Sequence, residues 1–160
     1  MNIRKGGNIK FYQILQGRSM SKLTGNIATC LCGSVKIRVT EINPKYTVCH
    51  CSSCRKWGGG PLFMVQCGTD VEFEGDDVIK EFDSSAWASR GFCSNCGTHL
   101  FSRFKKNGSY NMPVGLFPNT KNLEMSMQYF IDLKPSYYCF ANDTPEMTEA
   151  EIYTHFASEV

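Results

Sequence analysis

The chain has 160 residues, 42% of them hydrophobic and 12% aromatic, with a formal net charge of +2. This composition supports one ordinary folded domain and argues against disorder. The near-neutral charge offers no basic face for nucleic acid or an anionic membrane, and no apolar run of about 18 residues predicts a bilayer span.

The N-terminal segment differs in composition from the remainder of the chain. Residues 1–22 mix glycine, lysine and arginine without a clear period, although Met20 opens a stretch that is typical of a domain start. We expect residues 1–22 to be an extension, whether a cloning remnant, an upstream start or an added strand, and residues 23–160 to form a single domain. Residues 1–19 lack the apolar core of a secretory signal, which predicts a cytoplasmic protein.

Short strands dominate the chain after residue 25. Val35, Ile37 and Val39 alternate with polar residues, which predicts a half-buried strand. Similar patterns predict further strands at residues 46–50, 62–67, 71–73, 78–82, 98–104, 110–114 and 129–133. We therefore expect a mainly β fold of antiparallel sheets, packed as a sandwich or an open barrel.

Helix signals are few and short. Residues 51–57 precede a Gly-Gly-Gly-Pro stop, which predicts one or two helical turns. Thr148 and Glu151 have the spacing of a capping box, so a second short helix is expected over residues 148–156.

Seven of the nine cysteines fall into three tight clusters. These clusters are Cys30-x-Cys32, Cys49-His50-Cys51-Ser52-Ser53-Cys54 and Cys93-x-x-Cys96. In a reducing compartment such spacings indicate metal ligands rather than disulfides, because a tight turn aims both sulfurs at one ion. Four thiolates close a tetrahedral zinc site, and three leave one position open. Seven cysteines therefore predict one structural and one reactive site.

Two partitions of the seven cysteines are compatible with the spacing. Cys30 and Cys32 could join Cys93 and Cys96, or they could join two members of the middle cluster. Gly33 and Gly97 favour the first partition, because a glycine after the second cysteine lets backbone N–H groups turn toward the sulfurs.

The middle cluster carries its own charge signal. Arg55 and Lys56 follow its third cysteine directly, and these cations would offset the negative charge of three thiolates on a zinc ion. The hydroxyls of Ser52 and Ser53 are candidate donors to a substrate bound there.

Residues around the clusters have simpler interpretations. We expect structural roles for His50, which should point away from the metal, and for His99. Cys67 and Cys139 are expected to be small buried hydrophobic residues. Trp57 and the three glycines after it could form a lip over the open zinc position, or the glycines could merely turn the chain while Trp57 packs.

The ordered clusters, with the block CHCSSCRK at residues 49–56 and the run Phe92-Cys93-x-x-Cys96-Gly97, resemble the glutathione-dependent formaldehyde-activating enzyme family. That family includes the centromere protein V-like proteins, and the likeness covers about residues 25–140. The resemblance implies a zinc-bound, tent-like β fold related to methionine-R-sulfoxide reductases. It also implies a structural zinc on Cys30, Cys32, Cys93 and Cys96, and a labile catalytic zinc on Cys49, Cys51 and Cys54.

Two segments depart from the family's usual pattern. Members tend to carry a His-led apolar strand followed by a basic residue and a tryptophan, where this chain has Tyr129 and Tyr137 at about those positions. Residues 115–119 replace a common acidic turn. The first change bears on glutathione specificity more than on metal binding.

The resemblance implies a carbon–sulfur lyase that joins formaldehyde and glutathione to S-hydroxymethylglutathione, or that acts on a related thiol adduct of a small aldehyde. The alternative is a non-enzymatic zinc module that binds a protein or chromatin partner. A methionine-sulfoxide reductase would need a redox thiol outside the clusters, for which only Cys67 and Cys139 remain. Whether an exposed strand edge pairs two copies into a homodimer stays open.

Overall fold

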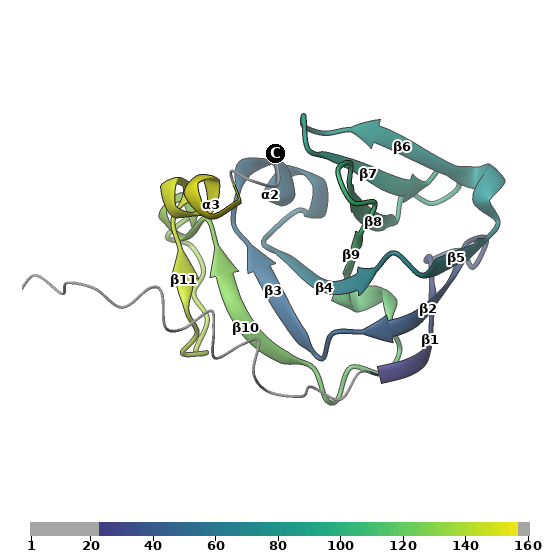
Figure 1. Cartoon of the computed structure of the whole chain (residues 1–160), viewed down its shortest axis with the longest axis horizontal. Coiled ribbons are helices and arrows are strands. Elements are labelled where there is room, and N and C mark those ends of the chain that lie inside the picture. The colour runs from purple at the N-terminus through teal and green to yellow at the C-terminus, as the bar shows by residue number, and fades with distance from the viewer. Residues whose placement is uncertain (1–22, 157–160) are drawn as a thin grey trace, which may run out of the picture.

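A computed structural model of the chain describes residues 23–156, and these residues form two β-sheets with few helices (Figure 1). The smaller sheet contains β1 (Leu23–Thr29), β2 (Lys36–Ile42) and β5 (Val71–Glu74). The larger sheet contains β3 (Lys45–Cys49), β4 (Leu62–Gly68), β6 (Ile79–Asp83), β7 (Ala88–Cys93), β8 (His99–Phe104), β9 (Tyr110–Pro113), β10 (Glu124–Tyr129) and β11 (Glu146–Met147).

Helices lie between strands and at the end of the described chain. The α-helices are α2 (Ser52–Gly58) and α3 (Glu149–Phe156), and three 3-10 turns are η1 (Asp76–Val78), η2 (Val114–Leu116) and η3 (Ile131–Leu133). Neither α2 nor α3 has the length or hydropathy of a bilayer-crossing helix. The expectation for residues 1–22 lies outside the described residues.

The larger sheet has the strand order β11-β10-β3-β4-β9-β8-β7-β6. Its neighbours pair antiparallel except at one end, where β10 runs parallel to both β3 and β11. The mainly β, largely antiparallel prediction is therefore confirmed. β10 follows β9 through residues 114–123 and β11 follows β10 through residues 130–145, and each connection returns the chain so that the next strand runs in the same direction.

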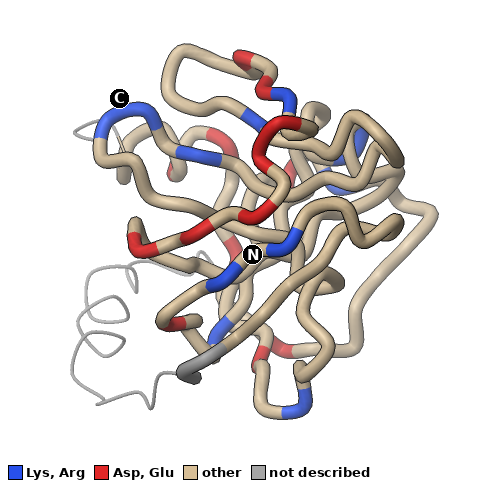
Figure 2. The backbone as a smooth tube through the Cα atoms, turned by 90° about the vertical axis from the view of Figure 1, so that its right-hand side faces the viewer, with Lys and Arg blue, Asp and Glu red and all other residues tan. Residues whose placement is uncertain are grey.

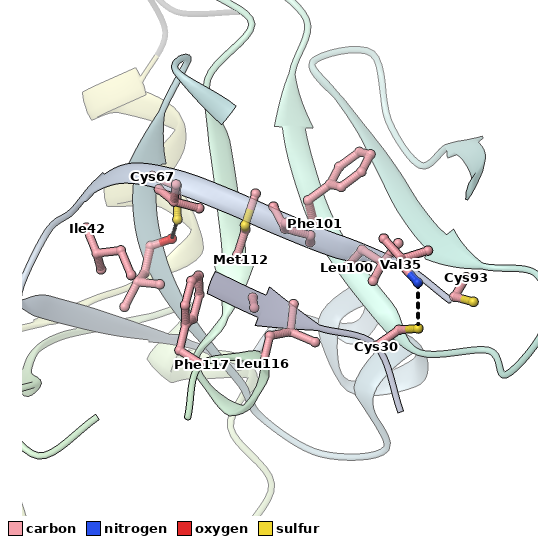
Figure 3. Packing of buried hydrophobic residues seen from close by; sticks show 14 residues of the cluster. Cys30, Val35, Ile42, Cys67, Cys93, Leu100, Phe101, Met112, Leu116 and Phe117 are labelled. Carbon is pink, nitrogen blue, oxygen red and sulfur yellow. Dashed lines mark hydrogen bonds between the residues drawn. The ribbon is translucent and has the colours of Figure 1, made fainter. Parts of the chain in front are cut away.

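The main core lies between the two sheets (Figure 3). Ile37 and Val39 of β2 are fully buried, and they face residues of the larger sheet such as Leu100, Phe101 and Met112. Burial of these side chains stabilises the fold by roughly 1.5–3 kcal/mol each. The alternating apolar residues that predicted β2 are therefore the side chains by which this strand faces the core.

One predicted strand is wrong. Residues 129–133 were expected to be extended, but β10 ends at Tyr129 and Ile131–Leu133 form a 3-10 turn. Phe130 has φ 58°, a left-handed conformation that ends the strand, and it is followed by this turn. The strand itself lies earlier, where Met125 and Met127 are buried.

Charges on the smaller sheet are paired by sign (Figure 2). Lys36 lies 3.5 Å from Glu74, and Arg38 lies 3.5 Å from Glu74 and 3.6 Å from Glu72, all between β2 and β5. These pairs are exposed and contribute at most about 1 kcal/mol each. Positive and negative side chains are therefore mixed along this face.

Candidate functional site

The first cysteine turn follows β1. The Gly33 N–H donates to the Cys30 carbonyl at 3.1 Å, and the Val35 N–H donates to the Cys30 sulfur at 3.2 Å. Gly33 has φ +76°, a left-handed conformation that a Cβ would strain. The glycine therefore closes the turn and lets a backbone N–H meet a sulfur.

The second cysteine turn has a similar build. The Gly97 N–H donates to the Cys93 carbonyl at 2.7 Å, and Gly97 has φ +75°. The hydroxyl of Thr98 lies 3.1 Å from the Cys96 sulfur and accepts the Leu31 N–H from the first turn at 3.1 Å. This hydrogen bonding lowers the pKa of Cys96 to about 5. Thr98 thus joins the two turns beside their sulfurs.

The two turns bring four sulfurs together. The sulfurs of Cys30, Cys32, Cys93 and Cys96 all lie within 4.8 Å of one another. The Cys30–Cys32 and Cys32–Cys93 sulfur distances are 3.5 and 3.9 Å. Sulfurs about 2.3 Å from a tetrahedral zinc would be about 3.8 Å apart, so this set fits that ion. The structure groups the cysteines in the long-range partition, not the local one.

The four-thiol cluster lies where the two sheets meet. Cys30 follows β1 of the smaller sheet, and Cys93 ends β7 of the larger sheet. Both residues belong to the main core, and Figure 3 shows them near Val35 and Leu100. An ion held there would tie one sheet to the other.

The middle cluster occupies the step from β3 to α2. Cys49 ends β3, Cys51 is the N-cap of α2, and Cys54 lies in the first helical turn. The Cys51 sulfur accepts the Cys54 N–H at 3.4 Å, a position where serine or aspartate is usual. The cap therefore holds one sulfur at the helix start and turns the next toward it.

The three sulfurs of Cys49, Cys51 and Cys54 also lie within 4.8 Å of one another. Cys54 is buried, whereas the other two are half-buried and pack with it over Leu62 and Met64 of β4. Hydrogen bonds from the Cys49 and Cys54 thiols lower the pKa of Cys51, and the pKa of Cys49 is raised because its thiol donates to both. The set has the softness and spacing for three zinc bonds.

A buried arginine, which the sequence did not indicate, touches this cluster. Arg90 of β7 is 8% exposed, and its Nη2 donates to the Cys54 sulfur at 3.3 Å. Its Nη1 is buried and has no hydrogen-bond partner. Arg90 comes from a strand far along the chain, so the motif itself carried no signal for it; a charged residue inside the small-residue run of residues 88–93 was the available hint.

The two cations that follow the middle cluster in the sequence do not lie against its sulfurs. Arg55 donates through Nε to the His50 carbonyl at 2.9 Å, and Lys56 is exposed. Ser52 and Ser53 are exposed on the first turn of α2. The cation that meets a sulfur of the triplet in the described residues is Arg90.

Trp57 packs against the larger sheet beside Arg90. Its ring centroid lies 5.9 Å from the Arg90 Cζ and 5.4 to 6.3 Å from the rings of His99, Phe92 and Phe82. Gly59 ends α2 in a left-handed conformation. Of the two interpretations of this segment, the packing one describes the structure.

His50 points toward β10 and the C-terminal segment. Its Nδ1 lies 2.7 Å from the Tyr138 hydroxyl, and its Nε2 lies 3.1 Å from the Gln128 side-chain oxygen. Gln128 donates its amide to Thr144 and Glu146, so its oxygen accepts from the His50 Nε2–H and Tyr138 donates to Nδ1. Burial lowers the pKa of His50, in keeping with the structural role expected for it.

His99 is a neutral packing residue. Its Nε2–H donates to the Phe101 carbonyl at 2.9 Å, while its Nδ1 is buried without a partner. Burial lowers the pKa of His99 to about 4. The structural role expected for His99 agrees with this environment.

The two cysteines outside the clusters differ. Cys67 is buried in the main core, and burial raises its pKa to about 12, as expected for an unreactive thiol. The expectation that Cys139 is buried is wrong, because this residue is exposed. Tyr138 and Phe140 both pack their rings on His50, so the residue between them faces outward.

The segment that departs from the family pattern begins at the last residue of β10 and continues as a 3-10 turn and loop toward His50. Tyr137 is 76% exposed, and its neighbour Tyr138 makes the hydrogen bond to His50. Tyr129 packs edge-on against Phe156 of α3, with centroids 6.3 Å apart. Tyr129 is the partner of Cys49 in the parallel pairing of β10 with β3, so the segment begins beside the triplet.

The fold and its cysteines together define a small, mainly β protein with two candidate metal centres. The family model of the glutathione-dependent formaldehyde-activating enzyme matches residues 26–133, and the chain belongs to this family.

Individual relatives agree with this assignment. The chain is 32% identical over 134 residues to an uncharacterized lyase of Schizosaccharomyces pombe, covering 83% of this chain and 96% of the relative. It is 30% identical over 82 residues to a Halomonas elongata protein whose name refers to the same family, covering 46% of this chain and 52% of that protein. A crystal structure of a Rhodobacter sphaeroides protein shares the fold, with a TM-score of 0.53, 21% identity, and coverage of 76% of this chain and 99% of that one.

Proposed function

We propose that this protein is a zinc-dependent carbon–sulfur lyase-type enzyme acting on a thiol adduct of a small aldehyde. The named reaction of its family suggests glutathione and formaldehyde as the thiol and the aldehyde, with S-hydroxymethylglutathione as the adduct. The S. pombe relative, which is named a lyase, supports the same class of reaction.

One observation carries this proposal: Cys49, Cys51 and Cys54 form a three-sulfur set separate from the four-sulfur cluster. Four thiolates complete a tetrahedral shell, whereas three leave a position for a substrate atom. Cys49 and Cys51 are only half-buried, so the set is reachable from solvent. In this proposal Cys49, Cys51 and Cys54 are ligands that hold a catalytic zinc, and none is a nucleophile.

The reaction makes or breaks one carbon–sulfur bond. The sulfur of the thiol attacks the aldehyde carbon, the carbonyl π bond opens, and the thiol proton ends on the former carbonyl oxygen. A zinc ion bound by the triplet would supply a centre at which the small thiol loses its proton more readily. The reverse reaction returns the proton to the leaving thiol.

The chain's own residues supply the surroundings of that centre. Trp57 packs against Phe82 and Phe92 and lies beside Arg90, so its ring helps to hold the Arg90 guanidinium. Arg90 donates to the Cys54 sulfur and keeps that sulfur in place. The exposed hydroxyls of Ser52 and Ser53 stand on the first turn of α2 and are candidates to donate to the substrate oxygen.

The four-sulfur cluster has a different proposed role. Cys30, Cys32, Cys93 and Cys96 would hold a structural zinc, because a complete thiolate shell leaves no position for a substrate. Its place between the two sheets supports this role. A methionine-sulfoxide reductase would have to use the exposed Cys139, since Cys67 is buried with a raised pKa.

The test is an exchange measurement on formaldehyde and glutathione by NMR, with and without the zinc-loaded protein. We expect the protein to accelerate exchange between free and adduct forms, and Cys54→Ser to abolish the acceleration. Cys139→Ser is the matched control, because it removes an exposed thiol outside both clusters. If the parent gives no acceleration, the assignment to this aldehyde and thiol is wrong.

A further inference from the structure

The environment of Arg90 differs from that of other arginines in the described chain. Arg38 and Arg103 are half-exposed and lie beside glutamates, and Arg55 is half-buried and donates to the His50 carbonyl. Arg90 is 8% exposed and forms no ion pair with a carboxylate in the described residues. A buried cation without an anionic partner is strongly unfavourable, so the site must supply negative charge in another form.

The sulfur of Cys54 is the group that meets this need. It accepts from Arg90 Nη2 at 3.3 Å, and the guanidinium carbon lies 5.9 Å from the Trp57 ring centroid. The aromatic ring favours the cation on one side, and a thiolate would favour it on the other. The other guanidinium nitrogen of Arg90, Nη1, is buried without a hydrogen-bond acceptor among the described residues.

Charge arithmetic connects Arg90 to the whole triplet. Three thiolates around a divalent ion leave one uncompensated negative charge, and a guanidinium carries one positive charge. We propose that Arg90 is the positioning residue that neutralises the three-thiolate centre of Cys49, Cys51 and Cys54. Arg90 thereby helps to retain the divalent ion and permits an anionic thiolate to occupy the remaining position.

This proposal rests on the metal-binding part of the proposed function, but not on the formaldehyde reaction. Its tests therefore read metal and thiolate binding directly. An enzyme that proved inactive toward formaldehyde and glutathione could still show the dependence on Arg90.

The first experiment measures the affinity of the weaker zinc site in Arg90→Met by competition with a chromophoric chelator. Outer-shell partners of metal ligands typically contribute 10- to 100-fold in affinity, and we expect a loss in that range. Arg90→Lys keeps the positive charge but lacks the planar guanidinium, so its zinc affinity should lie between those of Arg90→Met and the parent. Lys56→Met is the matched control, because Lys56 is an exposed cation of the same motif and should leave the affinity unchanged.

Folding is checked in the same samples. Retention of the first zinc equivalent and of the thermal transition shows that Arg90→Met is folded. A folded Arg90→Met that binds the second ion as tightly as the parent overturns the proposal. If Arg90→Met does not fold, Arg90→Gln replaces it, because glutamine also removes the positive charge: a folded Arg90→Gln that binds the second ion as tightly as the parent and Lys56→Met overturns the proposal.

The second experiment uses cobalt(II) in place of zinc and titrates 2-mercaptoethanol. Sulfur-to-cobalt charge-transfer absorption should increase as the small thiolate binds to the parent protein. We expect Arg90→Met to need at least about tenfold more thiol for the same spectral change, because its centre carries an unbalanced negative charge. Identical titrations for the parent and a cobalt-loaded Arg90→Met contradict the charge role.

Discussion

At the scale of the single residue, His99 links packing to pH. Its imidazole is buried with a pKa of about 4, against about 6.5 for an exposed histidine. The unfolded chain therefore binds a proton at a higher pH than the folded protein does. As the pH falls from 6.5 toward 4, protonation of the unfolded state lowers the free energy of unfolding.

This difference gives a direct prediction. Between pH 7 and pH 4, the parent should lose about 3 kcal/mol of unfolding free energy more than His99→Gln does. Urea unfolding at several pH values measures both slopes. Metal release in acid affects both proteins, so it cancels in the difference, and parallel slopes would show that His99 is not held neutral by burial.

Single residues also show what motif reading can find. The pairs Cys30/Cys32 and Cys93/Cys96 could be recognised because turn geometry near a cysteine pair is local, and glycines at 33 and 97 marked it. Their grouping into one cluster was favoured by the glycines and implied by the family resemblance, while the spacing also allowed the local partition. Arg90 could not be found in this way. Its contact with Cys54 joins β7 to α2 across 36 residues, and no local pattern encodes such a contact.

At the scale of the element, some strands were predictable from their residues and others, such as β7 and β10, were not. β2 alternates clearly and was found, with Ile37 and Val39 buried. β7 has the sequence ASRGFC, which lacks β-branched residues, and it was missed. Gly91 in its middle makes room for Phe101, because a Cβ there would lie 2.2 Å from the ring. Packing across the sheet, not propensity, makes this segment a strand.

The C-terminal helix α3 was predicted from its cap. The Thr148 N–H and hydroxyl both lie 2.8 Å from the Glu151 carboxylate, and the Glu151 N–H lies 3.4 Å from the Thr148 hydroxyl. This reciprocal pair is the capping box that the spacing indicated. Ile152 is the one buried residue of α3, so the cap acts together with that side chain and the ring contacts of Tyr153 and Phe156 to hold the helix.

We therefore expect Thr148→Ala to destabilise α3 by about 1 kcal/mol, and Thr148→Ser to have little effect. Amide hydrogen exchange over residues 149–156 measures this change locally. Because α3 contributes little to the core, the global unfolding transition should move less than the local exchange does. Equal protection in the alanine and serine variants would mean that the hydroxyl does not cap the helix.

At the scale of the whole molecule, the two clusters should differ in their consequences. Cys93 is fully buried in the main core and belongs to the cluster between the sheets. Cys54 belongs to the smaller group over β4. A structural zinc contributes its binding free energy to folding, whereas a catalytic one at the edge contributes little.

The prediction is that Cys93→Ser unfolds the domain, while Cys54→Ser stays folded and binds one zinc fewer. Circular dichroism and metal analysis of the purified variants measure both outcomes. A Cys54→Ser protein with the parent's zinc content would contradict the three-thiolate site. A folded Cys93→Ser protein would show that the two sheets hold together without the four-thiol cluster.

The pairing of the sheets also has a consequence for synthesis. The sulfurs of Cys32 and Cys93 lie 3.9 Å apart but are separated by 61 residues of chain. At typical translation rates the ribosome needs roughly 3–12 s to make that stretch. The first cysteine pair is therefore made seconds before the pair that completes its cluster, so Cys30 and Cys32 are free thiols during that interval and the cluster can close only after Cys93 and Cys96 have been made.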